Sequence, residues 1–287
     1  MLSAIDLIPE NLDYDEYLSN FDFANILNEP YENIPKNASK KLVPPINLAV
    51  DPDNKIPFPT EFDDLIRLHY IACSRKVTTI LEFGVGKSSL LFGNCLYLNK
   101  KKFHEYTSKN LRRGNLYQCH SIDNSQSWID NCKKIIPKNL LDNNLNNFYL
   151  SNLVISDFCG RLCTFYDPLP NICPDLIYLD APDQYSATSN LRGLSTRHQD
   201  RMPMSADILT FEHFLQPGCL IIVDGRTANA RFLSCNLQRN WSYFYSKEWD
   251  QHFFELQEEP LGIFNKKMID HCLGKSFYER LNKIIID

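Results

Sequence analysis

Four short apolar runs, each closed by an acidic residue, constrain the fold of this chain more than any other feature. They occupy residues 78–82, 117–123, 176–180 and 219–224. Runs that lack polar alternation suit strands that are buried on both faces, and such strands are typical of parallel sheets. Because helical or loop segments separate the four runs, the sequence predicts an α/β fold with a mostly parallel sheet.

The flanking segments complete this outline. Apolar spacing predicts a helix from residue 60 onward, with Thr60 as its N-cap. Residues 241–257 have the partly alternating aromatic pattern of an antiparallel hairpin. Prolines between positions 30 and 59 prevent a long helix, so residues 1–58 are predicted to form an arm or lid and residues 59–287 the domain. Further helices are predicted at residues 88–98, 125–136, 205–215 and 275–286.

The charge and cysteine content restrict the partners and the compartment. The net charge is −5 and the pI is near 5.8, whereas nucleic acids and anionic membranes select a basic face, so neither is an expected partner. The basic run between residues 100 and 113 is interpreted as a solvated loop. Ten cysteines without a CxxC pair, and an N-terminus without signal-peptide charge, indicate reduced thiols in a cytoplasmic protein.

The most informative local motif is ILEFGVGKSS at residues 80–89, in which a strand enters a glycine turn and then a helix. Glycines at such a turn let the backbone approach a ligand closely. The GKS tripeptide at 86–88 matches the end of a phosphate-binding loop, but Leu81 stands where that loop needs its first glycine. A dinucleotide turn needs Gly or Ala at Ser89, and Glu82 would repel a pyrophosphate.

An acid before the turn suits a cationic nucleoside without phosphates, because a carboxylate can orient an ammonium group or a ribose hydroxyl. The EFGVG sequence at residues 82–86 resembles the acid-x-G-x-G turn of the class I S-adenosylmethionine-dependent methyltransferases, and two following serines extend the likeness. The resemblance implies a doubly wound, mostly parallel, seven-stranded Rossmann-like sheet with a C-terminal antiparallel hairpin. It also implies S-adenosylmethionine as cofactor, bound through Glu82, Gly84, Gly86 and Ser88.

Three later positions resemble the same family, in the same order. Asp123, with Asn124 beside it, closes the second strand and corresponds to the acid that binds the ribose hydroxyls. Asp180 closes the fourth strand and corresponds to the acid beside the transferred methyl group, and LQPG at residues 215–218 resembles the turn before the fifth strand. The spacing between the turn and Asp123 is roughly twice the usual value, which we attribute to an insertion around residues 100–115.

Two kinds of chemistry are open at the strand ends. Asp180, Asp183 and Asp224 resemble the carboxylates that hold Mg²⁺ in metal-dependent O-methyltransferases, although Gly225 departs from that pattern. Without a metal, His198 is the candidate base, with Asp180 as the other catalytic residue. By elimination, the expected acceptor is an oxygen of a small molecule or a carbohydrate.

Two other functions and the oligomeric state stay open at this point. A methyltransferase-like fold can serve as a binding or scaffold protein without catalysis, because fold does not determine function. A nucleotide-dependent transferase that uses Lys87 is the second alternative, and the absence of a glycine at position 81 counts against it.

Overall fold

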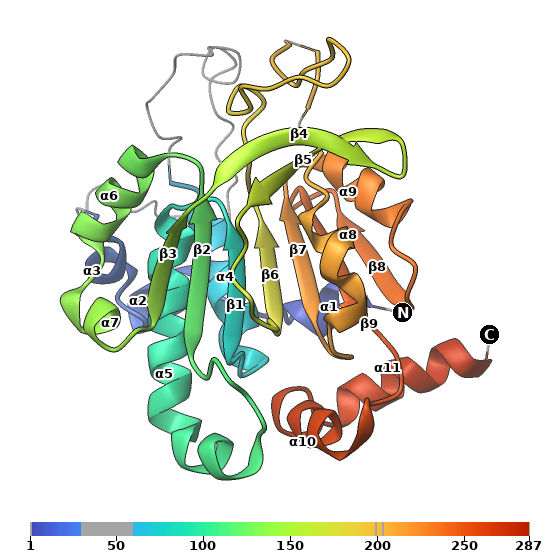
Figure 1. Ribbon diagram of the computed structural model, residues 1–287. Coiled ribbons are helices and arrows are strands. Elements are labelled where there is room, and N and C mark those ends of the chain that lie inside the picture. Colours follow the sequence, from blue (N-terminus) through green and yellow to red (C-terminus); the bar gives the residue numbers. More distant parts are fainter. Residues whose placement is uncertain (1, 30–59, 199, 203, 287) are drawn as a thin grey trace.

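The computed structural model describes residues 2–29, 60–198, 200–202 and 204–286. Its centre is a seven-stranded sheet with the strand order β3-β2-β1-β6-β7-β9-β8 (Figure 1). The strands are β1 (Thr79–Phe83), β2 (Gln118–Asp123), β3 (Asn146–Leu150), β6 (Leu176–Leu179), β7 (Leu220–Asp224), β8 (Trp241–Ser246) and β9 (Gln251–Leu256). The first five strands of this order are parallel, and β9 and β8 form an antiparallel hairpin. The predicted α/β class, the seven strands and the terminal hairpin are therefore confirmed.

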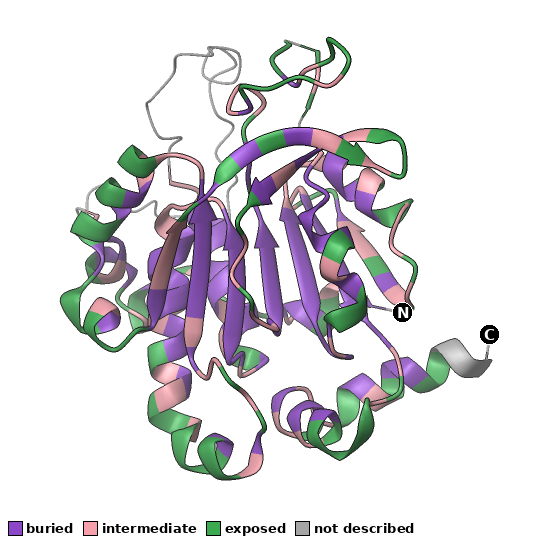
Figure 2. Cartoon of the chain, in the orientation of Figure 1, coloured by how far each residue is buried: buried purple, intermediate pink, exposed green. Residues whose placement is uncertain are grey.

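Helices cover both faces of the sheet. Alternate residues of β1 pack against the helices on the two faces. Ile80 packs with α4 and α5, while Leu81 and Phe83 pack on the opposite side with α8 and α9. Burial is almost continuous along the central strands (Figure 2), which explains their uninterrupted apolar runs. The helices are α1 (Ala4–Leu7), α2 (Tyr14–Asn20), α3 (Phe23–Leu27), α4 (Phe62–Ser74), α5 (Lys87–Asn110), α6 (Gln126–Ile135), α7 (Lys138–Asp142), α8 (Asp207–Phe211), the 3-10 turn Glu212–Phe214, α9 (Thr227–Ser234), α10 (Gly262–Cys272) and α11 (Lys275–Ile286).

The segment predicted to be an inserted loop is mostly helix. α5 continues to Asn110, since no glycine or proline interrupts it after Gly93, so residues 100–110 lengthen this helix. At its end Thr107 is buried and its hydroxyl meets the Tyr117 hydroxyl at 2.8 Å. The solvated-loop interpretation was also wrong for Arg113, whose side chain is only 5% exposed and pairs with Asp175.

The start of α4 also differs from the prediction. Glu61 is the N-cap residue, and it makes no side-chain cap. The Thr60 hydroxyl instead donates to the Glu29 carboxylate at 3.0 Å, a partner that is distant in the sequence. Local capping rules could not anticipate this contact.

A second, two-stranded sheet was not predicted. It consists of β4 (Asn152–Phe158) and β5 (Arg161–Asp167), which pair antiparallel and arch over the carboxyl ends of the parallel strands (Figure 1). The hairpin places β5 residues above the end of the sheet where the sequence locates the candidate site.

The described part of the N-terminal arm packs on the domain. Leu7 and Ile8 join the core cluster of the main sheet, while Phe23 and Leu27 pack against α4 residues such as Phe62. Residues 30–58, the rest of the predicted arm apart from position 1, lie outside the described residues, and so does residue 59. None of the helices described is both long and apolar enough to cross a membrane.

Candidate functional site

Four of the predicted residues lie in one row across the sheet. In the pairings among β2, β1, β6 and β7, the last aligned residues are Ile122, Phe83, Leu179 and Val223. The next residues along these strands follow in the same order: Asp123, Gly84, Asp180 and Asp224. Adjacent strands are about 4.8 Å apart, so these four residues are neighbours. Three of them carry carboxylates, and Gly84, between Asp123 and Asp180, has no side chain.

Gly84 is a glycine that the geometry requires. Its φ is +98°, which side chains rarely allow, and an added Cβ would lie 3.1 Å from the Ala181 Cβ. Its amide donates to the Ile122 carbonyl at 2.9 Å. Gly86 differs, because its backbone is extended and no described atom lies within 4 Å of an added Cβ. The close approach at this turn therefore depends on Gly84.

Asp123 connects the end of β2 to the glycine turn. Its carboxylate accepts hydrogen bonds from the Val85 amide at 3.0 Å and the Ser125 amide at 2.8 Å. The side chain is buried, and burial raises its pKa despite these bonds. Asn124 lies beside it and is half-buried. The second strand end and the turn thus form one unit, as the predicted cofactor site requires.

Glu82 lies beneath the turn, away from solvent. It is fully buried and accepts hydrogen bonds from the hydroxyls of Ser88 at 2.5 Å, Ser89 at 2.6 Å and Ser121 at 2.5 Å. Burial raises the pKa of Glu82 to about 7. Glu82 and Ser88, both predicted to bind cofactor, bind each other here and hold the start of α5 against β1.

Asp180 is the accessible carboxylate of the row. Its side chain is 52% exposed. Desolvation by the surrounding protein raises the pKa of Asp180, and the negative charge of the Asp224 carboxylate raises it further. Arg226 donates to the Asp180 carbonyl and to the Pro182 carbonyl, both at 2.6 Å, and its Nε lies 3.7 Å from the Asp180 carboxylate. The guanidinium therefore fixes the segment that follows β6.

Asp224 is oriented from two sides. The Tyr178 hydroxyl donates to one carboxylate oxygen at 2.6 Å, and the Gln251 amide donates to the other at 3.2 Å. Gln251 in turn accepts from Arg67 on α4 at 3.4 Å. A chain of polar contacts therefore runs from α4 to the end of β7.

Two of the three predicted magnesium ligands, Asp180 and Asp224, lie at neighbouring strand ends, and magnesium binding stays a prediction. Asp183 lies in the exposed segment after β6, where its carboxylate accepts from the Tyr185 amide at 2.6 Å and from the Ser186 hydroxyl. Within the described residues, no three His, Cys, Asp or Glu side chains are arranged to hold a metal ion. The sheet register aligns Asp180 with Asp224 but leaves Asp183 outside the row.

His198 lies in an exposed segment, and its described contacts do not include the row. Its ring nitrogen accepts from the Asp200 amide at 3.2 Å and lies 3.9 Å from the Asp200 carboxylate. Its carbonyl accepts from Gln184 at 2.8 Å. The role of His198 as a base stays a prediction.

Tyr166 on β5 is a candidate that the sequence did not reveal. Its ring lies 5.8 Å from the Phe83 ring, and its buried hydroxyl has no hydrogen-bond partner in the described structure. Burial and, to a smaller extent, the negative charge of the nearby Asp123 raise the pKa of Tyr166. The positive charge of Arg226 acts in the opposite direction. The Arg226 Nε is also buried and, among the described residues, makes no hydrogen bond, although it lies 3.7 Å from the Asp180 carboxylate. Since buried polar atoms are normally satisfied, two such atoms near one site suggest that a polar ligand completes it. No sequence signal could have identified Tyr166, because its hairpin was not recognised.

A cavity of about 350 Å³ lies between β5, the segment before α8 and the start of α9. This volume is in the range of small-molecule sites. Thr196 is buried there, and its hydroxyl has no hydrogen-bond partner in the described parts of the chain. The described lining residues are Leu162, Cys163, Thr196, Asp200, Arg201, Met202, Met204 and Ala228.

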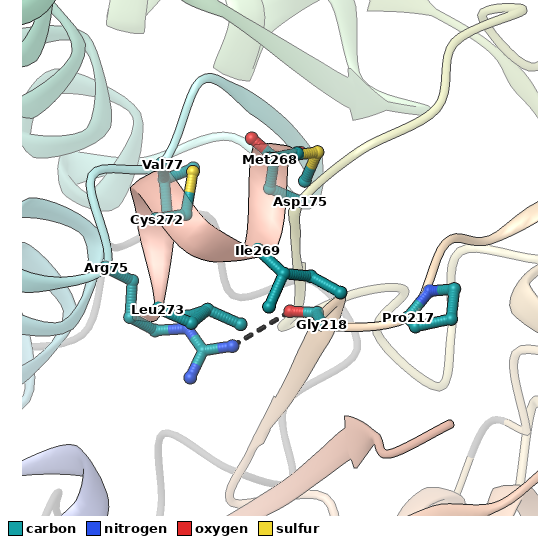
Figure 3. Close-up of a pocket in the computed structure, with 9 residues that line it drawn as sticks. All are labelled: Arg75, Val77, Asp175, Pro217, Gly218, Met268, Ile269, Cys272 and Leu273. Carbon is teal, nitrogen blue, oxygen red and sulfur yellow. Dashed lines mark hydrogen bonds between the residues drawn. The ribbon is translucent and has the colours of Figure 1, made fainter. Parts of the chain in front are cut away.

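A second cavity lies at the opposite end of the sheet, beside Arg75, Asp175 and Gly218 (Figure 3). Its volume is about 10 Å³, which is at most the space of one water molecule. It is a packing defect between α10 and the amino ends of the strands, and it does not bear on the site.

Lys87, the lysine of the GKS tripeptide, is already engaged. Its ammonium group binds the Glu29 carboxylate and the Thr60 hydroxyl. Burial lowers its pKa. A phosphate at this turn would have to compete with a carboxylate for the lysine.

Comparisons with known proteins return structural matches only. No family model matches the sequence, and no curated protein does. An O-methyltransferase from Bacillus cereus in complex with SAH is 11% identical with a TM-score of 0.35, covering 87% of this chain and 93% of its own. The SAH-bound Podospora anserina methyltransferase PaMTH1 is 12% identical with a TM-score of 0.37, covering 88% and 100%.

The C-terminal domain of a precorrin-6Y C5,15-methyltransferase from Rhodobacter capsulatus is 12% identical with a TM-score of 0.31, covering 75% of this chain and 97% of its own. Similarity at this level says nothing about activity. Function has to be inferred from the residues of this chain.

Proposed function

We propose that this protein is an S-adenosylmethionine-dependent methyltransferase that acts on an oxygen of a small molecule. The observation that carries the proposal is the row Asp123, Gly84, Asp180 and Asp224 at the carboxyl ends of four adjacent parallel strands. In open α/β sheets this edge is where ligands bind.

The charge of the row favours a cationic ligand. Asp123 and Asp180 flank the gap at Gly84, and Asp224 extends the negative charge along the edge. S-adenosylmethionine is a cationic nucleoside without phosphates and, when bound, supplies an electrophilic methyl group. A nucleoside triphosphate would bring negative charge to the same edge. Lys87, the cation that could bind its phosphates, is already paired with Glu29.

Individual residues have distinct proposed roles in binding. Gly84 lets the turn lie against the segment after β6, and the second lone pairs of Asp123, with Asn124 beside it, would accept ribose hydroxyls. Asp180 would face the positively charged part of the cofactor, and Arg226 keeps the backbone of that segment in place. The Tyr166 hydroxyl, which has no hydrogen-bond partner among the described residues, would donate to the same ligand.

Proton transfer from a hydroxyl acceptor needs a base with a pKa near the working pH. Asp180 fits this requirement because its pKa is raised while its side chain stays accessible. His198 would have to move toward the row to compete for this role, since its described partners are Asp200 and Gln184.

The 350 Å³ cavity supports a small acceptor. Its walls combine apolar side chains, such as Leu162 and Met204, with the charged Asp200 and Arg201 and with the Thr196 hydroxyl, which has no hydrogen-bond partner among the described residues. Ala228 follows Arg226 by two residues, so the cavity is close along the chain to a group that contacts Asp180. A small hydroxyl compound with both apolar and polar groups therefore suits this cavity.

Calorimetric titration with S-adenosylmethionine and S-adenosylhomocysteine, with ATP and NAD as controls, tests the cofactor. We expect saturable binding of the first two ligands only. Asp123→Ala should weaken this binding at least about tenfold, because the residue both contacts the ligand and anchors the turn. Asp142→Ala, at an exposed position on α7, should leave it unchanged. Binding of ATP alone, or of no ligand, would refute the proposal.

A transfer assay with labelled cofactor and a panel of hydroxylated small molecules tests the activity. Ala228→Trp should fill the cavity and reduce turnover while the cofactor affinity stays constant. Ser234→Trp, on the exposed part of α9, is the matched control. Cofactor binding without turnover of any acceptor would favour a non-catalytic binding protein.

A further inference from the structure

Two cysteines on adjacent helices lie in direct contact. The sulfur of Cys73, at the end of α4, is 3.1 Å from the sulfur of Cys95 on α5. Cys73 is partly exposed, whereas Cys95 is fully buried. A disulfide has a sulfur separation of about 2.05 Å, so the bond requires a shift of only about 1 Å.

The surroundings of the pair distinguish its two thiols. Both ring nitrogens of His69 lie 3.8–3.9 Å from the Cys73 sulfur. The contact with Cys95 and the presence of His69 lower the pKa of Cys73, while burial raises the pKa of Cys95 well above its usual value. The thiolate character is therefore concentrated on the more accessible sulfur.

His69 is held rigidly in this position. The Tyr17 hydroxyl meets its Nδ1 at 2.9 Å, and the Asn94 side-chain oxygen meets its Nε2 at 3.1 Å. The rings of Phe21 and Phe23 pack edge-on against the imidazole. The pair is thus built from α4 and α5 together with residues of the N-terminal arm.

We propose that Cys73 and Cys95 form a reversible oxidation site for peroxides, with Cys73 as the attacking thiol and Cys95 as the resolving thiol. The Cys73 thiolate attacks one peroxide oxygen, the O–O bond breaks, and a sulfenic acid and one water result. The Cys95 thiol then attacks the Cys73 sulfur, the S–O bond breaks and the second water leaves. Two thiols and one hydrogen peroxide give one disulfide and two waters.

The bond would enclose the glycine turn. Residues 74–94, between the two cysteines, contain β1, Gly84 and the first turns of α5. Cross-linking this loop removes conformational freedom from the unfolded chain, so the oxidised protein should melt about 5 °C or more above the reduced protein. This inference does not depend on the proposed methyltransferase activity.

The test uses the full chain with Cys159→Ser and Cys235→Ser, which removes two exposed thiols. After treatment with hydrogen peroxide, we expect a mass decrease of two hydrogen atoms, two fewer free thiols and a peptide in which Cys73 is linked to Cys95. Dithiothreitol should reverse all three changes. Cys173→Ser, which removes another partly exposed cysteine whose sulfur contacts the Phe214 carbonyl, should leave the cross-link intact.

Two further variants assign the roles. Cys95→Ser should leave Cys73 as a sulfenic acid that dimedone traps, and His69→Gln should slow the peroxide reaction at Cys73 about tenfold because less thiolate is present. The proposal is overturned if peroxide leaves Cys73 unmodified, oxidises it without the Cys95 cross-link, or links it to another cysteine.

Discussion

At the scale of single residues, the acid before the glycine turn has a different environment from the one its motif suggests. Glu82 shares a strand face with Ile80, so it points toward α5 and meets three serine hydroxyls. Gly84, two residues later, reaches the row of strand ends and lies against Ala181. The acid supports the turn, and the glycine lets the turn pack closely against Ala181.

Glu82 should make stability depend on pH. Its pKa is raised from 4.5 to about 7, so between these values the folded protein binds this proton more tightly than the unfolded chain does. The corresponding stabilisation, about 3 kcal/mol, is present at low pH and is lost as the pH rises from about 4.5 to about 7. Urea unfolding at pH 5 and pH 8 should show a smaller loss in Glu82→Gln than in the native sequence, because Asp180 and Asp207, whose pKa values are also raised, titrate in both proteins. The exposed Glu105→Gln should behave like the native protein, and identical pH profiles for all three would contradict the assignment.

The two glycines of the turn should respond differently to the same substitution. Gly84→Ala places a Cβ 3.1 Å from the Ala181 Cβ at a positive φ, and should cost about 1–2 kcal/mol of unfolding free energy and most of the cofactor affinity. Gly86→Ala meets open space on an extended backbone and should be nearly neutral. Denaturant melts and calorimetry measure both effects. Equal losses in the two variants would show that the turn has no special requirement at Gly84.

At the scale of elements, the site depends on how the segment after β6 is fixed to the start of α9. Arg226 spans this junction and donates to the carbonyls of Asp180 and Pro182. The β4–β5 hairpin closes the same edge from above and contributes Tyr166 (Figure 1). The carboxyl ends of the strands are therefore enclosed by elements that come from three separate parts of the chain.

Arg226→Gln should loosen this junction. The variant loses two charge-assisted hydrogen bonds to backbone carbonyls, which are worth about 1.5–3 kcal/mol each before relaxation. We expect cofactor affinity to fall about tenfold, because Asp180 is then less well positioned. Arg231→Gln, on the exposed part of the same helix, controls for lost positive charge. Unchanged affinity in Arg226→Gln would rule out a positioning role.

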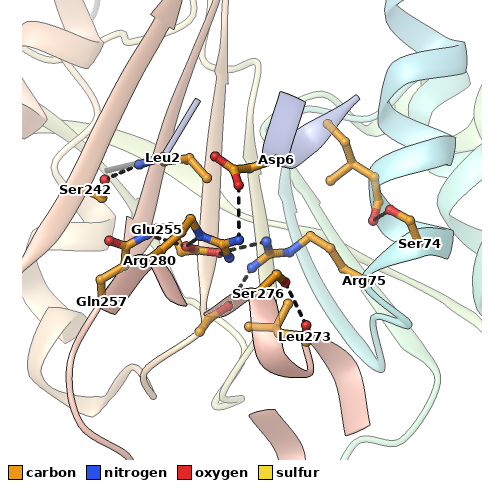
Figure 4. A network of polar contacts seen from close by, with 12 residues as sticks. Leu2, Asp6, Ser74, Arg75, Ser242, Glu255, Gln257, Leu273, Ser276 and Arg280 are labelled. Carbon is orange, nitrogen blue, oxygen red and sulfur yellow. Dashed lines mark hydrogen bonds and ion pairs between the residues drawn. The ribbon is translucent and has the colours of Figure 1, made fainter. Parts of the chain in front are cut away.

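At the scale of the whole molecule, one buried ionic network joins the two ends of the described chain. Glu255 on β9 accepts from Arg75 at 2.8 Å and from Arg280 on α11 at 2.8 Å, and Arg280 also reaches Asp6 on α1 at 3.4 Å (Figure 4). Burial would raise the pKa of Glu255, but the two guanidinium groups lower it overall. The network links α1 and α11 to β9, away from the candidate site.

Arg280→Ala should destabilise the fold without affecting the site. Removing one partner from a buried ion pair leaves uncompensated charge, so we expect a loss of about 3 kcal/mol in unfolding free energy. Lys283→Ala, exposed on the same helix, should cost less than about 0.5 kcal/mol. Guanidinium unfolding measures both values. A loss in Arg280→Ala no larger than that control would show that the network contributes little.

The fold could be predicted largely from sequence because its strongest signals are local. The apolar runs that became β1, β2, β6 and β7 are buried on both faces, so their composition alone indicates strands. The β4–β5 hairpin was missed, because exposure alternates along β4 and only three consecutive residues of the strand, 153–155, are apolar. The length of α5 was underestimated, because a polar helix surface reads like a loop when its buried contacts, such as Thr107 with Tyr117, are unknown.

By itself, the sequence determined which residues stand at the strand ends and that Gly84 follows an acid-bearing strand, because position along a strand is a local property. Only the tertiary structure decided which of them meet. The register across β2, β1, β6 and β7 brings Asp123, Gly84, Asp180 and Asp224 into one row. The same packing turned Glu82 inward and left Asp183 and His198 outside the row. It also brought the sulfurs of Cys73 and Cys95, on two adjacent helices, into contact. Such contacts depend on strand pairing and helix packing between distant segments, which residue spacing along one chain does not encode.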